Sequence, residues 1–169
     1  RSTLFPYTTL FRSDSVTQNT QTQTQPETTA AEDPEMTLEQ FIEKTEGIWI
    51  IDSTINHMYD DEYCFEVLII SADSCGTAVY PGGFDRPGKI NAFEVVEENV
   101  FRLSLLYEAG EFMGDNLPEA RDTLTITATE EGKIKAQYSD TDEYSMIFGG
   151  KDFAEANAAA AAWMKAQKP

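Results

Sequence analysis

The sequence has very little of four things: histidine, cysteine, basic residues and long hydrophobic runs. Its 169 residues include one His and two Cys, and its 12 Lys and Arg face 30 Asp and Glu, for a net charge of −18. So acidic a chain repels phosphate backbones, which excludes nucleic-acid binding. No run of about 18 apolar residues occurs, so the sequence predicts no transmembrane segment.

The scarcity of histidine, the usual base that activates a serine or cysteine nucleophile, also argues against catalysis. The single histidine, His57, lies in the polar stretch STINHMYDDE, and no recognisable nucleophile motif accompanies it. Because a serine or cysteine nucleophile needs a base held by an orienting group, we predict no catalytic residues and interpret His57 as a solvated turn residue. Cys64 and Cys75 lie too far apart along a predicted hairpin to bridge within it, whereas pairing through another strand stays open.

Two acidic clusters raise the question of a metal site; they are Asp60, Asp61 and Glu62, and Asp140, Asp142 and Glu143. Calcium takes about six to eight oxygens on a shaped loop, and the EF-hand pattern with its central glycine is absent. One His and two Cys at these spacings also match no usual zinc site. We therefore predict no metal and no cofactor, and interpret both clusters as solvated turns.

The first 35 residues stand apart from the rest. Residues 1–13, RSTLFPYTTLFRS, equal the one-frame translation of a common short-read sequencing adapter, so we interpret them as an artefact that replaces the true N-terminus. Residues 14–35 contain no aromatic residue, no Leu and no Ile, so they are predicted to form a disordered tether. The folded domain is then expected to occupy residues 36–169.

Within that domain, apolar residues alternate with a period of two, which is typical of strands with one buried face. Eight candidate strands follow one another with short connections, at residues 47–52, 63–71, 77–83, 89–97, 100–108, 123–130, 133–139 and 144–150. No helical run separates them, so parallel crossovers are excluded. The prediction is a mainly β protein, an antiparallel up-and-down eight-stranded barrel, with a two-sheet sandwich as the alternative.

Helices are predicted at both ends of the domain. Thr37 and Gln40 form a capping-box pattern before the short apolar stripe of MTLEQFIEKTEG, and Gly47 is expected to end this helix. Asp152 and Glu155 form a cap pair before the alanine-rich C-terminal segment. The apolar face of the C-terminal helix should pack on the outside of the sheet.

Several apolar rows on the predicted strands would line the barrel, because residues two apart share a face. The bulkiest candidates for contact with a ligand are Phe65, Phe93, Phe101, Tyr107, Tyr138 and Tyr144. Eight short strands leave room for side chains or one small ligand. The bulk of these rings favours a filled interior, with a cavity below about 300 Å³.

The predicted order of elements resembles the lipocalin pattern of bacterial lipocalin-like lipoprotein domains. It consists of a short helix, then Gly47-Ile48-Trp49, then an antiparallel meander and a C-terminal helix. In that family the G-x-W tryptophan plugs the closed end of the barrel, and an arginine near the last strand packs over it. This chain differs there, since no arginine follows Arg121 and Lys151 is the nearest cation after the last strand.

The resemblance implies an extracytoplasmic binding module for a small apolar or amphipathic ligand. The Thr/Gln/Pro/Glu segment is similar to the tethers of bacterial surface lipoproteins, which implies attachment to a membrane through a lipid anchor that this sequence lacks. The alternative is a non-enzymatic structural or interaction domain with a filled barrel, whose acidic surface would meet a cationic protein partner.

Overall fold

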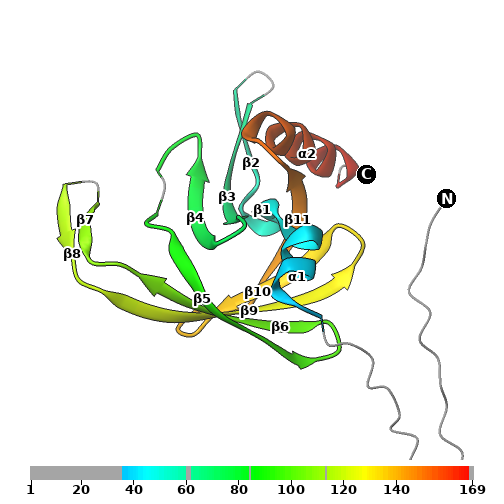
Figure 1. Ribbon diagram of the computed structural model, residues 1–169. Coiled ribbons are helices and arrows are strands. Elements are labelled where there is room, and N and C mark those ends of the chain that lie inside the picture. The colour runs from blue at the N-terminus through cyan, green and yellow to red at the C-terminus, as the bar shows by residue number, and fades with distance from the viewer. Residues whose placement is uncertain (1–35, 60–61, 84, 113, 168–169) are drawn as a thin grey trace, which may run out of the picture. The chain divides into compact units, whose positions relative to one another are not determined.

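The computed structural model describes residues 36–59, 62–83, 85–112 and 114–167. The predictions for residues 1–13 and 14–35 lie outside this range. Within the described part, the chain folds into a closed antiparallel β-barrel with two helices (Figure 1). No helix among the described residues has the length and apolarity needed to cross a membrane.

Eight strands form the ring, which confirms the predicted fold class. In spatial order they are β1 (Gly47–Ile51), β11 (Tyr144–Gly150), β10 (Lys133–Tyr138), β9 (Ala120–Glu130), β6 (Val100–Tyr107), β5 (Gly88–Glu97), β4 (Ser74–Tyr80) and β3 (Glu62–Ile70). The ring closes where β1 pairs with β3, with Trp49 opposite Leu68. Closure leaves no long unpaired edge at β1, which otherwise would invite pairing with another chain.

The β4–β5 seam is the thinnest part of the ring. Only two residue pairs are in ladder register there, Ser74 with Lys89 and Cys75 with Gly88. Beyond them, two backbone hydrogen bonds hold the connecting loop to β4, from the Val79 N–H to the Gly83 carbonyl and from the Asp85 N–H to the Thr77 carbonyl. The loop residues Asp85 and Arg86 lie at the end of the barrel where β1, β6 and β10 finish. This end is called the open end below.

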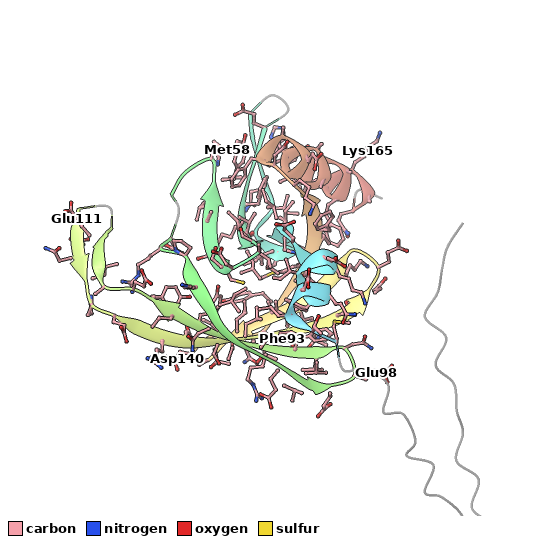
Figure 2. The ribbon with its side chains drawn as sticks, viewed as in Figure 1. Met58, Phe93, Glu98, Glu111, Asp140 and Lys165 are labelled. Carbon is pink, nitrogen blue, oxygen red and sulfur yellow. The ribbon has the colours of Figure 1, made fainter. Side chains whose placement is uncertain are left out.

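The opposite, closed end is covered by α1 (Leu38–Thr45). The predicted capping box is present, because the Thr37 hydroxyl accepts from the Gln40 N–H and the Gln40 side chain accepts from the Thr37 N–H. The buried ring of Phe41 packs at a tilt against Phe93 and Phe101, with ring centroids 5.2 and 5.1 Å away. In Figure 2, Phe93 points from β5 towards α1. These rings fill the closed half of the barrel.

The helix α2 (Phe153–Ala166) packs on the outer face of β1, β3 and β11, as predicted. Asp152 caps it by accepting from the Glu155 N–H at 2.9 Å. Ala156 and Ala160 are fully buried against the sheet. Because β1 has the barrel core on one face and α2 on the other, all five of its residues are buried, which explains its unbroken apolar sequence GIWII.

The helix α1 ends at Thr45 with Glu46 as its C-cap, and Gly47 follows as the first residue of β1 with φ of +141°, in agreement with the predicted helix stop and strand start. A Cβ on Gly47 would lie 2.7 Å from the Gly150 carbonyl oxygen, so glycine is required by close approach as well as by φ. The connections η1 (Asp52–Thr54), β2 (Asn56–Tyr59), β7 (Gly110–Phe112) and β8 (Asp115–Leu117) add short elements where loops were expected.

The predicted facing of β3 is wrong. Phe65 was expected inside the barrel, but it lies with Val67 and Ile69 on the outer face beneath α2. Leu68 and Ile70 point into the barrel core instead. In a segment with apolar residues on both faces, alternation cannot decide which face turns inwards. The outer row is apolar because α2 covers it.

Candidate ligand cavity at the open end of the barrel

A cavity of about 370 Å³ lies at the open end of the barrel. Its deep wall consists of Ile51, Ala136 and Met146, each at most 5% exposed. The expectation of a filled interior, with a cavity below about 300 Å³, is therefore wrong, because the bulky phenylalanines gather with α1 in the closed half and leave the open half hollow. The remaining wall combines aliphatic, aromatic and polar groups, and it comes from β3, β4, β6, β9, β10, β11 and the β4–β5 loop.

Two tyrosines form one side of the cavity. The side chains of Tyr138 on β10 and Tyr107 on β6 share a hydrogen bond. Desolvation raises the pKa of Tyr138 well above its ordinary value, and the nearby Tyr107 and Asp122 raise it further. The pKa of Tyr107 is also raised, first by burial and then by the charge of Asp122. Both phenol groups are therefore neutral at physiological pH, and they give this side of the cavity hydrogen-bonding hydroxyls.

Tyr107 is held in place by two contacts. It packs over Gly88 of β5, where a Cβ would lie 2.8 Å from the tyrosine ring. The Arg86 guanidinium lies 5.4 Å from the ring centroid, a cation–π arrangement. Arg86 is itself anchored, since its Nη1 donates to the carbonyl oxygens of Glu108 and Pro118, each at 3.0 Å.

Three carboxylates also line the cavity: Glu66, Asp85 and Asp122. Asp85 accepts a hydrogen bond from the Thr77 hydroxyl. Asp122 accepts from the Ser139 hydroxyl and from the Thr123 N–H, the latter at 2.6 Å. Glu66 lies on the inward-facing row of β3, two residues before Leu68. The entrance therefore combines apolar and acidic groups.

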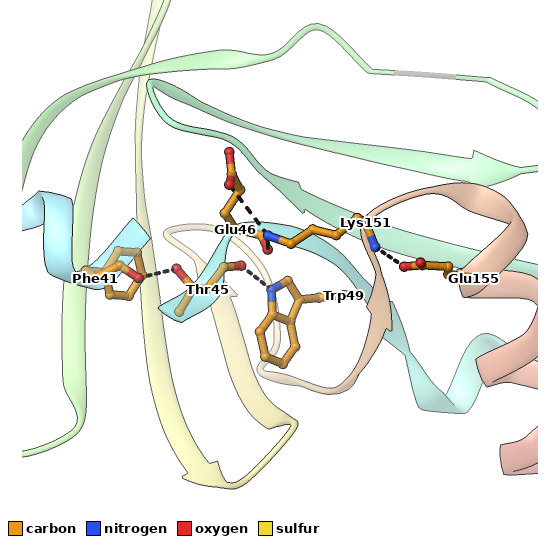
Figure 3. Close-up of polar contacts among 6 residues, drawn as sticks. All are labelled: Phe41, Thr45, Glu46, Trp49, Lys151 and Glu155. Carbon is orange, nitrogen blue, oxygen red and sulfur yellow. Dashed lines mark hydrogen bonds and ion pairs between the residues drawn. The ribbon is translucent and has the colours of Figure 1, made fainter. Parts of the chain in front are cut away.

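The closed end is sealed by polar contacts around Trp49 (Figure 3). Trp49 is 4% exposed, and its Nε1 donates to the Thr45 carbonyl oxygen at 2.7 Å. The Thr45 hydroxyl in turn donates to the Phe41 carbonyl oxygen at 2.8 Å. The Lys151 Nζ donates to the Glu46 carbonyl oxygen at 2.8 Å. These bonds fix the end of α1 over the barrel core.

The six residues predicted to contact a ligand separate into three places. Tyr107, Tyr138 and Tyr144 come together around the cavity. Phe93 and Phe101 lie at the closed end against α1, away from the cavity. Phe65 is on the outer face, stacked on Tyr80 at 5.1 Å. The motif residues Gly47 and Trp49 lie at the closed end.

The polar lining residues were missed by sequence reasoning, which followed only apolar rows. Glu66 carried a usable signal, because it interrupts the otherwise apolar run FEVLII. Asp85 and Arg86 follow a Gly/Pro-rich turn, and nothing in their local sequence predicts that the loop folds against the barrel entrance. Asp122 immediately precedes the Thr-rich part of β9 and gives no such signal.

The described residues show how the potential metal ligands and the two cysteines are placed. No group of three or more His, Cys, Asp or Glu side chains is arranged to hold a metal ion in that part of the chain. Asp60 and Asp61 lie outside the described residues. Cys64 and Cys75 are free thiols. Cys75 is buried, and desolvation raises its pKa to about 12, so it is a neutral thiol at pH 7.

The fold and the cavity together define a closed eight-stranded antiparallel barrel with one sealed end and one hollow end. This architecture is compatible with a lipocalin-like fold. Comparisons of the chain with protein-family models, with curated proteins and with solved structures found no match.

Proposed function

We propose that this barrel is a binding module for one small apolar or amphipathic molecule, held at its open end. The observation that carries the proposal is the cavity of about 370 Å³, with its deep wall of Ile51, Ala136 and Met146. Ligand pockets are typically concave and mostly apolar, with a few polar groups that fix orientation, and begin at about 300 Å³. The cavity has this composition.

Apolar groups at the entrance support the same proposal. Val79 is 51% exposed and Tyr144 is 37% exposed, and both line the cavity. Exposed apolar side chains beside an apolar hollow give a ligand a continuous surface from solvent to the deep wall. A ligand would remove this surface from water and gain about 25 cal/mol per Å² of apolar area.

The competing function is that of an interaction domain, in which the acidic outer surface meets a cationic partner. The filled closed half, packed around Phe41, Phe93 and Phe101, is the observation in its favour. In that case the cavity would be a packing defect, and no small molecule would stabilise the fold. The same measurement therefore separates the two functions.

The test is thermal unfolding with and without candidate ligands: fatty acids, haem and small aromatic molecules. A ligand present at a hundred times its dissociation constant, and bound only by the folded state, adds about 2.7 kcal/mol of stability. Ala136→Leu would fill the deep wall and should abolish the shift. Ala162→Leu, on the exposed side of α2, is the matched control and should retain it. If no compound raises the melting temperature of the unmodified protein, the binding function is wrong.

We also propose a non-enzymatic role outside the cytoplasm. What supports it is sequence pattern: the acidic composition, the single His57 without a nucleophile motif, and the Thr/Gln/Pro/Glu segment at residues 14–35. Protease treatment of intact source cells should remove the protein if it is displayed on the surface, and protection from protease would contradict display. A non-enzymatic protein leaves its ligand unaltered, so mass spectrometry should find that a ligand incubated with the protein and then recovered from it is chemically unchanged.

A further inference from the structure

We propose that the cavity prefers ligands that join an apolar body to a cationic head group. This inference rests on the proposed function and adds the charge of the ligand to it. It follows from the balance of charged groups around the cavity, which includes three carboxylates and one guanidinium. Charge complementarity of this kind determines which ligands a site accepts more than how tightly it binds all of them.

Glu66 is the carboxylate placed to meet a cationic head group. It shares the inward-facing row of β3 with Leu68, so its carboxylate lies at the entrance while Leu68 lies in the core. Within the described residues, the Glu66 carboxylate has no hydrogen bond and no ion pair; only its backbone N–H is bonded, to the Thr54 hydroxyl. It is therefore available to a ligand.

The other two carboxylates are positioned but not neutralised. Asp85 is bonded by the Thr77 hydroxyl, and Asp122 by the Ser139 hydroxyl and by the backbone N–H groups of Thr123 and Ser139. These donors are uncharged, so they fix the carboxylates without cancelling their charge. The ion pairs of the described chain lie elsewhere, for example between Arg102 and Glu94.

Arg86 does not compensate the carboxylates. Its Nη1 is held by two backbone carbonyls, and its guanidinium lies over the Tyr107 ring. It forms no ion pair with any lining carboxylate in the described part of the chain. The lining as a whole is thus acidic, and its neutral tyrosine rings offer electron-rich faces that also attract cations.

This arrangement defines the class of ligand. An alkyl or aryl body would lie against Ala136 and Met146, and a single ammonium would lie near Glu66 at the entrance. A carboxylate head in the same place would meet like charge, and a neutral head would gain nothing from it. Fatty acids should accordingly be weak ligands.

The experiment uses three probes with one octyl chain each: octylammonium, octanol and octanoate, titrated into the protein by calorimetry at low salt. Octylammonium should bind at least about tenfold more tightly than octanol, and octanoate should bind most weakly. The preference should shrink as salt is added, because salt screens charges at an exposed entrance.

A matched pair of variants identifies the group responsible. Glu66→Gln should weaken octylammonium binding severalfold and leave octanol binding unchanged. Glu98→Gln removes the same charge from the β5–β6 turn, far from the cavity, and should change neither (Figure 2). If Glu98→Gln weakens octylammonium as much as Glu66→Gln does, the preference comes from overall charge, and the inference is overturned.

Two further outcomes separate this inference from the function on which it rests. If octanol or octanoate binds as tightly as octylammonium, the charge preference is wrong and the binding function stands. If none of the three binds, and no fatty acid, haem or aromatic compound raises the melting temperature, the binding function itself fails.

Discussion

The Lys151 Nζ donates to the carbonyl oxygen of Glu46 at 2.8 Å and lies 3.5 Å from the carboxylate of the same residue. These two residues stand 105 positions apart, one after the last strand and one between α1 and β1. Their contact therefore ties the two ends of the folded chain together at the closed end of the barrel, beside buried Trp49 (Figure 3).

Replacing this lysine should cost a modest amount of stability. Lys151→Met removes one charged hydrogen bond to a carbonyl, while the ion pair adds little because both side chains are about half exposed. We expect the free energy of unfolding in urea to fall by about 1 kcal/mol. Lys165→Met, near the end of α2, is the control and should change it by less than about 0.5 kcal/mol. Equal effects would show that the contact has no particular role.

The tryptophan of the closed end should matter far more. Trp49→Ala removes a buried aromatic side chain and is expected to cost about 3–5 kcal/mol. Trp49→Phe keeps most of the apolar contact and loses the Nε1 hydrogen bond to Thr45, so it should cost less than the alanine variant. Urea unfolding measures both. A cost below about 1 kcal/mol for Trp49→Ala would place this side chain outside the core.

Phe65 should affect stability without affecting the ligand. It is 1% exposed and stacks on Tyr80, which stacks on Phe153 of α2 at 5.2 Å. Phe65→Ala should therefore loosen α2 and cost about 3–5 kcal/mol. Ligand affinity, measured well below the melting temperature, should change less than about twofold. A large loss of affinity in the folded variant would mean that Phe65 faces the ligand after all.

Cys75 should make the protein sensitive to alkali. Burial raises its pKa from 9.0 to about 12, so the unfolded chain loses this proton at lower pH than the folded chain. Stability linked to the neutral thiol is fully present below pH 9, and it is lost as pH rises from 9 to about 12. Unfolding free energies measured across this range should fall more steeply for the unmodified protein than for Cys75→Ala. Parallel pH profiles would contradict this.

Sequence patterns predicted the ring of strands well because each barrel strand carries its own signal. In β6, for example, Phe101, Leu103 and Leu105 alternate with Arg102 and Ser104, and only one facing is compatible with burial. The caps at Thr37 and Asp152 are equally local, since a side chain and a backbone N–H three residues away suffice.

The errors occur where a residue's role depends on distant parts of the chain. β3 is apolar on both faces, and its facing is decided by α2, whose sequence lies some ninety positions away. The cavity depends on where α1 places Phe41. Because Phe93 and Phe101 pack against that ring in the closed half of the barrel, they do not fill the open half. The prediction of a filled interior used the total bulk of the aromatic side chains, and that total does not tell in which half of the barrel they lie.

The polar half of the site was missed for the same reason. Glu66 and Asp122 belong to different strands, and Arg86 to a loop, so their convergence on one entrance is a property of barrel closure. The tyrosines Tyr107, Tyr138 and Tyr144 were found because each stands in a recognisable strand row.

The most direct test of the account is methyl NMR of the protein labelled at its methionines, titrated with octylammonium. Met146 lines the cavity, whereas Met164 belongs to α2 and packs against the outer face of the sheet, and Met58 is exposed on β2. We predict a saturable shift of the Met146 methyl signal, with the signals of Met164 and Met58 unchanged. A titration in which Met146 does not move, or in which Met58 or Met164 moves instead, would contradict a ligand site at the open end of the barrel.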